Sequence, residues 1–189
     1  MSNNNQIIYI LTNEAMPGYI KIGKTINLEQ RIKDLSSSTS VPLPFACFYA
    51  CIVKDMDFVE HQLHDAFDNN RINPKREFFK IDPERVVAAL KLAEIENITP
   101  RKDIIEDEDD RQALNEARNR RPPFKFSMVA ILPNSEIVFS RNENIKAKVL
   151  DNHFIELNGK RTTISKAAQE LLDVEWPAQG PLYWKYEGE

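Results

Sequence analysis

The chain has 189 residues, of which 42% are hydrophobic and 9% aromatic, and its formal net charge is −4 at pH 7. This length suits one large domain or two small ones with a buried core. The negative charge argues against a protein that coats nucleic acid through a generally basic surface, but it allows a local basic patch. No apolar run approaches the ~18 residues of a membrane span, and the polar N-terminus MSNNNQ is not a signal peptide. We therefore expect a cytoplasmic protein without a membrane partner.

Two cysteines, Cys47 and Cys51, lie in the apolar run FACFYACIV, which predicts a strand. Residues four apart on a regular strand share a face but are too far apart for a disulfide. The run contains no Cys or His pair at metal-binding spacing. We expect both thiols to be small buried side chains in a reducing compartment.

The first half of the chain predicts an α+β domain with a small antiparallel sheet flanked by helices. Two β-rich segments flank the Pro-Gly turn NEAMPG and should form a hairpin. The run FACFYACIV is long and apolar enough for a central strand, and capping residues precede three amphipathic segments. The predicted elements, in order, are strands at 6–12 and 19–24, a helix from Asn27, a strand at 45–53, a helix from Asp55 or Asp57, a strand at 77–81 and a helix at 82–95.

The composition changes after residue 98. Residues 99–123 carry an acidic run and then a basic run, and predict a charged linker that is partly helical, with the charge order that a helix macrodipole favours. This segment is either a solvated connector or a basic contact with DNA. Residues 124–189 predict a second small α+β domain, so the expected division is 1–98, 99–123 and 124–189. The predicted elements of this second domain are strands at 124–132, 135–140, 145–151 and 153–159, a helix at 163–172 and an aromatic strand from Gly180.

Five polar residues of the first half form a set that suits phosphodiester hydrolysis. That reaction needs a base for the attacking water, a cation for the phosphorane charge and a metal ligand that helps the leaving oxygen. Taken singly, each residue is explained by packing, by solvation or by a surface pair of side chains four apart on a helix. Tyr9 and Lys21 lie on the predicted hairpin, Arg31 on the next helix, and Glu60 and His64 on the second helix.

Residues 6–98 resemble the GIY-YIG nuclease superfamily, in particular its branch of phage T5 Orf172 and MUG113-type domains. The first motif aligns with Ile7-Ile8-Tyr9, which keeps the tyrosine but lacks the glycine. The second aligns with Lys21-Ile22-Gly23, which keeps the glycine but has lysine in place of tyrosine. The remaining matches are Lys24, Thr25, Asn27 and Arg31, and then Glu60, Leu63, His64, Phe67, Arg71, Asn73, Glu77, Phe78 and Phe79.

The resemblance implies a role for each aligned residue. Tyr9 would orient or deprotonate the water, Arg31 would hold the scissile phosphate, and Glu60 would bind one divalent metal ion, Mg²⁺ or Mn²⁺. Asn73 would be the family's late polar residue. Lys21 is the departure from the family, and a lysine there could lower the pKa of Tyr9 or pair with the phosphate itself.

Several charged residues near these motifs have more than one interpretation. His64 is either an acid/base or water-orienting group, or a structural residue hydrogen-bonded under the strand at 77–81. We expect Glu77 to pair with Arg71 or Arg76. A phosphate bound after the hairpin would explain why cations gather there in an acidic chain. The DNA-contacting candidates of the first half are Lys24, Lys33, Arg71 and Asn73, beside Lys21 and Arg31.

The second half resembles the RAMA-like domain found beside restriction enzymes and adenine methylases. The aligned residues are Ala147, Val149, Ile155, Asn158, Gly159, Ile164, Ser165, Ala167, Ala168, Gly180 and Trp184. The same residues would also serve as core and turn positions of any small α+β domain. The resemblance implies DNA reading, in which an aromatic face would meet an exposed base. Lys160, Arg161 and Trp184 are the candidate contacts, and a core position for Trp184 is the alternative.

Together these features predict a metal-dependent DNA endonuclease of the GIY-YIG type, targeted by its C-terminal domain, in a restriction or phage-defence role. A DNA-binding module without catalysis is the alternative, favoured by Lys21 and the missing first glycine. A protein-interaction scaffold that recruits a partner through its acidic linker is a third interpretation. With one site per chain, a double-strand cut would need a homodimer or two successive nicks.

Overall fold

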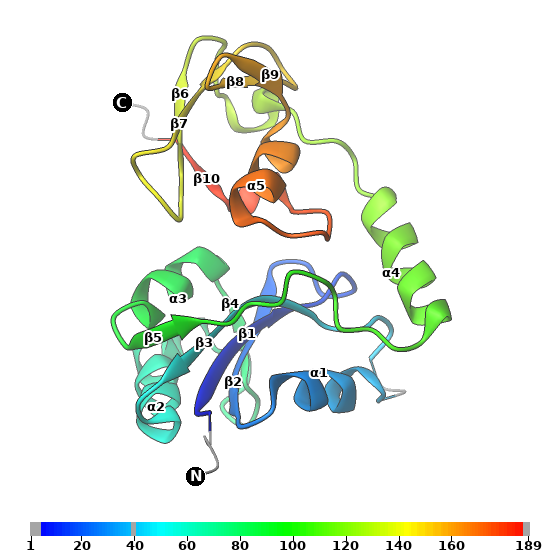
Figure 1. The fold of residues 1–189 in the computed structure, drawn as a ribbon, viewed down its shortest axis with the longest axis vertical. Coiled ribbons are helices and arrows are strands. Elements are labelled where there is room, and N and C mark those ends of the chain that lie inside the picture. Colours follow the sequence, from blue (N-terminus) through cyan, green and yellow to red (C-terminus); the bar gives the residue numbers. More distant parts are fainter. Residues whose placement is uncertain (1–4, 39–40, 187–189) are drawn as a thin grey trace. The chain divides into compact units, whose positions relative to one another are not determined.

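The computed structural model describes residues 5–38 and 41–186. The chain forms two compact units, residues 1–120 and 121–189, each with its own five-stranded antiparallel sheet (Figure 1). The predicted α+β class, with helices flanking the first sheet, is confirmed. Parts of three predictions lie outside the described residues: the polar N-terminal stretch, two positions of the Ser-rich loop and the last three positions of the terminal strand. Among the described residues, no helix is both long and apolar enough to cross a bilayer.

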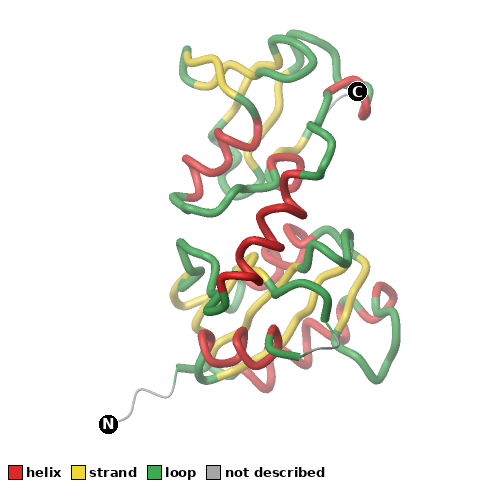
Figure 2. The backbone as a smooth tube through the Cα atoms, turned by 90° about the vertical axis from the view of Figure 1, so that its right-hand side faces the viewer, coloured by secondary structure: helices red, strands yellow, loops and turns green. Residues whose placement is uncertain are grey.

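The first sheet has the strand order β4-β2-β1-β3-β5. Helix α1 covers one of its faces, and α2 and α3 lie on the other, as Figures 1 and 2 show. The strands are β1 (Ile7–Thr12), β2 (Tyr19–Thr25), β3 (Ala46–Val53), β4 (Phe78–Lys80) and β5 (Glu94–Asn97). The helices are α1 (Leu28–Ser36), α2 (Met56–Ala66) and α3 (Pro83–Leu90), with a short 3₁₀ helix, η1, at Asp68–Asn70.

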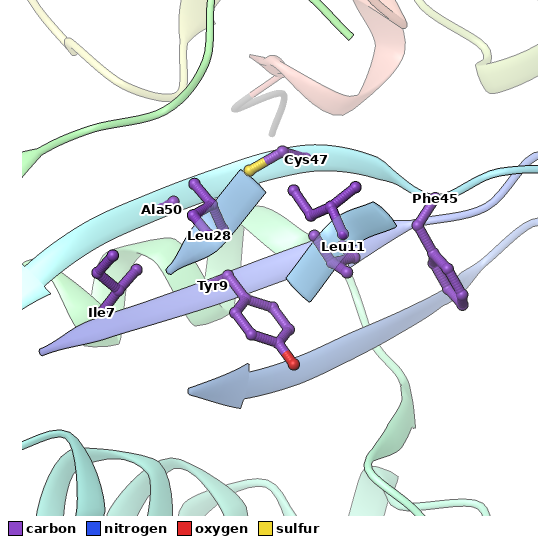
Figure 3. Packing of buried hydrophobic residues seen from close by; sticks show 8 residues of the cluster. Ile7, Tyr9, Leu11, Leu28, Phe45, Cys47 and Ala50 are labelled. Carbon is purple, nitrogen blue, oxygen red and sulfur yellow. The ribbon is translucent and has the colours of Figure 1, made fainter. Parts of the chain in front are cut away.

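Alternation along β1 divides its side chains between the two faces of the sheet. Ile7, Tyr9 and Leu11 belong to one core cluster with Leu28 and Ile32 of α1 (Figure 3). The side chains between them on β1 therefore face α2. Because Tyr9 pairs with Gly23 of β2, the α1 face also carries the glycine and the odd-numbered residues of β2.

The helix starts follow the predicted capping residues. The Asn27 side chain accepts a hydrogen bond from the backbone N–H of Gln30 at 3.1 Å. Asp55, and not Asp57, caps α2 by accepting from Phe58 N–H at 2.9 Å. Asp82 caps α3, with a proline in its first turn. These caps satisfy N–H groups that the first turn of a helix leaves unpaired, so they fix where each helix begins.

The third helix is shorter than predicted. It ends at Leu90, and residues 94–97 form β5 against the outer edge of β3. The apolar residues Leu92 and Ile95, which suggested further helical turns, are exposed. Helical periodicity alone cannot reveal that a neighbouring strand offers a free edge. Residues 94–97 pair with β3 because this tertiary contact outweighs their local helical preference.

The predicted placement of the two cysteines on one face is wrong. The register of β1 against β3 shifts between Ile10 and Leu11, so an irregularity interrupts the alternation of β3. Cys47 joins the α1-side cluster with Ala50, and Cys51, next to Ala50, points to the opposite face. Both cysteines are buried, as expected. Burial raises the pKa of the Cys51 thiol to about 12, so it is unreactive in the native state.

The charged segment at 99–123 contains the expected helix, α4 (Glu108–Asn119), capped by Asp107. The helix packs with the first unit, since Leu114 is buried. Arg118 forms an ion pair with Asp103 at 2.6 Å and lies 3.8 Å from Glu14, on the loop after β1. The segment is therefore anchored to the first unit by apolar and ionic contacts.

The second unit contains an antiparallel sheet of order β10-β6-β7-β8-β9 and the helix α5 (Ile164–Leu172), capped by Thr163. The predicted strand at 124–132 is wrong, because residues 126–129 form a 3₁₀ helix, η2, that the left-handed Ala130 (φ 57°) ends. Asn158 and Gly159 have the positive φ angles that a two-residue hairpin turn requires. The strands are β6 (Glu136–Phe139), β7 (Lys146–Val149), β8 (Ile155–Leu157), β9 (Lys160–Thr162) and β10 (Trp184–Lys185), the last preceded by the 3₁₀ helix η3 (Gly180–Leu182).

Candidate functional site

The site of the first unit is built around the close approach of Tyr9 to Gly23. The Tyr9 ring extends from β1 across β2 (Figure 3). A Cβ atom placed on Gly23 would lie 2.4 Å from the Tyr9 hydroxyl oxygen and 2.6 Å from Cζ. Any side chain at this position would collide with the phenol, so glycine is needed here for space. The sequence motif that keeps this glycine thus has a steric reason.

Arg31 on α1 contacts the Tyr9 phenol from the helix side of the sheet. Its Nε donates a hydrogen bond of 3.2 Å to the Tyr9 hydroxyl oxygen. Tyr9 is 0% exposed, and burial, the largest influence, raises the pKa of its phenol even though Arg31 opposes the shift. The suggestion that Lys21 lowers the pKa of Tyr9 is therefore not what the structure shows. At neutral pH the Tyr9 phenol is protonated and shielded from water.

Lys21, the residue in place of the family tyrosine, pairs with Glu77. Its ammonium group donates to a carboxylate oxygen of Glu77 in a short contact and lies 5.4 Å from the centre of the Phe78 ring. The pairing of Lys21 with Phe78 across β2 and β4 brings the two charged side chains together. The predicted partners of Glu77, Arg71 and Arg76, are therefore wrong. Finding the correct pair from sequence would require knowing that β4 adds to the outer edge of β2, which is a non-local contact.

Glu77 also belongs to this site, although the sequence predicted for it only a structural ion pair. Burial works to raise its pKa, but the hydrogen bond and charge of Lys21, with the charges of His64 and Arg31, outweigh burial and lower it. The charge of Glu77 in turn acts on both Tyr9 and Arg31. Glu77 therefore belongs to the same electrostatic group as Tyr9, Lys21 and Arg31.

Glu60 reaches the site from the opposite face of the sheet. Lys24 follows Gly23 on β2 and so points towards α2, where its ammonium group lies 2.7 Å from Glu60 and 2.7 Å from Asp57. These two carboxylates raise the pKa of Lys24. The charge of Glu60 contributes to the raised pKa of Tyr9, although no direct contact joins the two described side chains. The charge of Glu60 therefore influences the pKa of Tyr9, and the Glu60 carboxylate already forms an ion pair with Lys24.

The four clustered cations that motivated a phosphate site have different partners. Lys33 pairs with Glu29 at 2.7 Å and with Glu106 at 2.6 Å. Lys21 and Lys24 are also paired with carboxylates. Arg31 alone among the four has a neutral hydrogen-bond partner, the Tyr9 phenol. Within the described part of the chain its guanidinium group forms no ion pair, although the charges of Glu77 and Asp34 act on it.

His64 lies on the α2 face of the sheet, behind the residues just described. Its Nε2 is 3.3 Å from the carbonyl oxygen of Ile22, and its ring centre is 5.1 Å from that of Phe79. These contacts correspond to the structural interpretation, a histidine placed under the strand of Phe78 and Phe79. Its charge still reaches Glu77.

The other DNA-contacting candidates of the first unit help to shape the loop before β4. Arg71 Nε donates to the carbonyl oxygen of Arg76 at 2.7 Å, and its guanidinium group lies 5.6 Å from the centre of the Phe79 ring. The Asn73 side chain accepts from the N–H of Lys75 at 2.9 Å. The tip of this loop is exposed and basic, and it leads directly into Glu77.

The candidates in the second unit also have internal partners. Trp184 donates its indole N–H to the carbonyl oxygen of Ile164 at 3.1 Å and packs against the core, as the core alternative expected. Arg161 pairs with Asp151 at 3.0 Å and stacks on Phe154 at 4.1 Å from the ring centre. Lys160 lies 3.6 Å from Glu170 on the surface. The two basic residues of β9 are exposed, whereas Trp184 is half-buried.

Within residues 5–38 and 41–186, no three His, Cys, Asp or Glu side chains lie close enough together to hold a metal ion. A divalent cation in the first unit would therefore depend on one carboxylate and on oxygen atoms from a substrate or from water. Mg²⁺ is often bound in this way, through one or two carboxylates and substrate phosphates.

Comparison with known proteins gives a family match within the first unit. Residues 6–94 match the family model of the T5orf172 domain, a GIY-YIG-like domain associated with nucleases. This range contains Tyr9, Lys21, Gly23, Arg31 and Glu77, and the predicted resemblance of the first half is confirmed. No curated protein and no solved structure matches the chain. The family match ends before residues 124–189, so the RAMA-like resemblance stays a prediction.

Proposed function

We propose that the first unit hydrolyses phosphodiester bonds of DNA, with Arg31 as the residue that binds the scissile phosphate. The match to a nuclease-associated domain supports DNA as the partner. The observation that carries the assignment is the Tyr9–Arg31 hydrogen bond above Gly23. It holds a guanidinium group that forms no ion pair with a carboxylate among the residues that the structure describes, although the charges of Glu77 and Asp34 act on it. A fixed cation of this kind stabilises the charge that grows on phosphate oxygens in the transition state.

Tyr9 acts in this proposal by positioning Arg31. The buried phenol accepts from Nε and leaves the two terminal nitrogen atoms of the guanidinium group to meet phosphate oxygens. Because Arg31 is only half-buried, a phosphate can approach it from solvent. Gly23 allows the phenol to reach this place, so the two motif residues and the arginine act as one unit.

In this proposal a divalent cation, Mg²⁺ or Mn²⁺, would be held by Glu60 together with a substrate phosphate. The charge of Glu60, like that of Glu77, reaches Tyr9. The Glu60 carboxylate contacts the ammonium group of a lysine, which sits on a flexible side chain. A bound cation would supply positive charge to the oxygen that leaves phosphorus. Lys24 would have to give up its contact with Glu60 when the cation binds.

A DNA-binding module without catalysis is the second candidate, and specific contacts favour it. Tyr9 is fully buried, and Lys21 and Glu60 are both committed to ion pairs. Such a protein would bind a phosphate at Arg31 but would not cut. Ion pairs such as those of Lys21 and Glu60 also occur in networks that serve only to stabilise a fold.

We further propose that the second unit contacts DNA through the exposed basic strand β9, which carries Lys160 and Arg161. This assignment rests on the RAMA-like residue series and on the exposure of both side chains. The double variant Lys160→Ala/Arg161→Ala should weaken DNA binding several-fold while a short-substrate cleavage rate at saturation stays unchanged. Equal affinity of variant and native protein would contradict this role.

Nicking of supercoiled plasmid separates the two candidates for the first unit. The native protein should nick in Mg²⁺ or Mn²⁺ and stop in EDTA. Glu60→Ala should abolish cleavage but retain measurable DNA binding, and Glu96→Ala on the exposed edge strand β5 is the matched control. Cleavage by Glu60→Ala at the native rate would remove the metal assignment. Binding without any nicking by the native protein would establish the non-catalytic candidate.

A further inference from the structure

We propose that Glu77 accepts the proton of the attacking water and that Lys21 is the residue that positions it. This inference rests on the proposed phosphodiester hydrolysis and assigns a residue to a role that the resemblance gave to Tyr9. The geometry that points to Glu77 is its contact with the buried Lys21 at the edge of β2 beside Tyr9 and Arg31.

Access to water distinguishes Glu77 from Tyr9. The Tyr9 residue is 0% exposed, and its hydroxyl group lies between Gly23 and Arg31. The Glu77 side chain is 39% exposed, although one of its oxygens contacts Lys21. A base must come within hydrogen-bond distance of the water that it deprotonates. Of the two groups, only the carboxylate is exposed to solvent and so open to a water molecule in this structure.

The arrangement of Lys21 suits a positioning residue. Its side chain is 8% exposed, runs beside the Phe78 ring and ends at Glu77, so it has little freedom to reach a phosphate. A buried ammonium group needs a partner, because desolvation of an unpaired charge is costly. Lys21 therefore fixes one oxygen of Glu77 and leaves the other for water. The substitution of lysine for the family tyrosine thus brings a carboxylate to this edge.

The charges around Glu77 keep it ionised when a substrate approaches. Lys21 on β2, Arg31 on α1 and His64 on α2 all favour the carboxylate form. Tyr9 on β1 faces the group as a protonated phenol, and Glu60 lies on the far side of the sheet and pairs with Lys24. An ionised carboxylate can accept a proton across the neutral pH range, which a protonated phenol cannot.

The proposed step is balanced in atoms and charge. The oxygen of water forms a new bond to phosphorus, and one water proton passes to the free oxygen of Glu77. The bond from phosphorus to the leaving deoxyribose oxygen breaks, and that oxygen takes a proton from solvent. Glu77 then releases its proton to solvent, so the residue returns to the carboxylate form.

The pH dependence of single-turnover DNA cleavage tests this assignment. Glu77→Gln should lower the cleavage rate by about 100-fold or more, the usual contribution of a general base, and should remove the acidic limb of the profile. Lys21→Met should move that limb to higher pH, because Glu77 loses the ammonium group that stabilises its charged form. A purely structural role for Lys21 would lower the rate at every pH without moving the limb.

Lys24→Met is the matched comparison, since it removes the lysine partner of Glu60 instead. A limb that moves in Lys21→Met and not in Lys24→Met supports Glu77. A limb that moves only in Lys24→Met, or a Glu77→Gln protein that cuts at the native rate, overturns the inference but leaves the nuclease function intact. A native protein that does not cut at all overturns both. Circular dichroism spectra identify any variant that fails to fold, and the Lys21→Met profile then decides.

Discussion

The phenol of Tyr9 fills the space in which a side chain at Gly23 would begin, 2.4 Å from hydroxyl oxygen to the position of a Cβ atom. The two residues face each other across β1 and β2, and Arg31 closes the phenol from the helix side. The packing of Tyr9 against Gly23 therefore also fixes the position of Arg31, the member of the cation cluster whose hydrogen-bond partner is a neutral phenol.

We predict that Gly23→Ala displaces the Tyr9 ring. Overpacking of this kind typically lowers the free energy of unfolding by about 1–3 kcal/mol. Urea unfolding followed by far-UV circular dichroism measures the loss. The same substitution in a Tyr9→Ala background should cost much less, because the colliding atoms are gone. Equal costs in both backgrounds would show that the phenol does not set the requirement for glycine.

Tyr9→Phe should disturb Arg31 without emptying the core. The variant removes one hydrogen bond, worth about 1 kcal/mol, and keeps the ring packed against Gly23. We expect a small loss of stability and a drop in cleavage rate larger than the loss of DNA affinity, because a less well oriented guanidinium group still attracts phosphate. Cleavage and binding assays on the same preparation compare the two effects. Unchanged cleavage would argue that the hydrogen bond has no role in positioning Arg31.

The stability of the first unit should depend on pH through Glu77. Its folded-state pKa is lowered, so the stabilisation is complete above the unfolded-state value of about 4.3 and is lost as pH falls through the folded-state value. Lys21→Met should therefore flatten the decline in unfolding free energy below about pH 5. Arg111→Met, which breaks a pair whose side chains are 46% and 84% exposed, is the control and should change little. An identical acid decline in Lys21→Met would contradict the pairing.

Lys24 should compete with divalent cations for Glu60. Its ammonium group lies 2.7 Å from both Glu60 and Asp57, so Lys24→Met leaves two carboxylates without their cation. We predict several-fold tighter Mn²⁺ binding, measured by isothermal titration calorimetry. Lys33→Met equally frees two carboxylates, Glu29 and Glu106, and controls for a more acidic surface. The same gain in both variants would mean that Glu60 offers no particular cation site.

Local patterns in the sequence predicted most elements of the first unit. Asn27 and Asp55 mark the starts of two helices because capping is a contact over only three residues. The series of motif residues also located Tyr9, Gly23 and Arg31 on neighbouring elements. In these cases the determining interactions are either short in sequence or encoded in a family pattern.

The features that sequence analysis missed depend on contacts between distant segments. The Lys21–Glu77 pair exists because β4 joins the outer edge of β2, and β5 exists because β3 has a second free edge. The irregularity in β3 that separates Cys47 from Cys51 has no marker such as glycine in the sequence. The η2 segment looked like a strand because its residues are apolar, yet Met128 and Val129 are exposed.

The central claim is that a DNA phosphate binds at Arg31, and the salt dependence of DNA binding by Arg31→Met and Lys33→Met tests it most directly. The account predicts that Arg31→Met weakens binding and reduces the slope of log affinity against log salt by about 1, as expected for the loss of one phosphate contact. Lys33→Met should keep the native affinity and slope, because Lys33 is already paired with two carboxylates. Native affinity and slope in Arg31→Met, or equal losses in both variants, would contradict the claim.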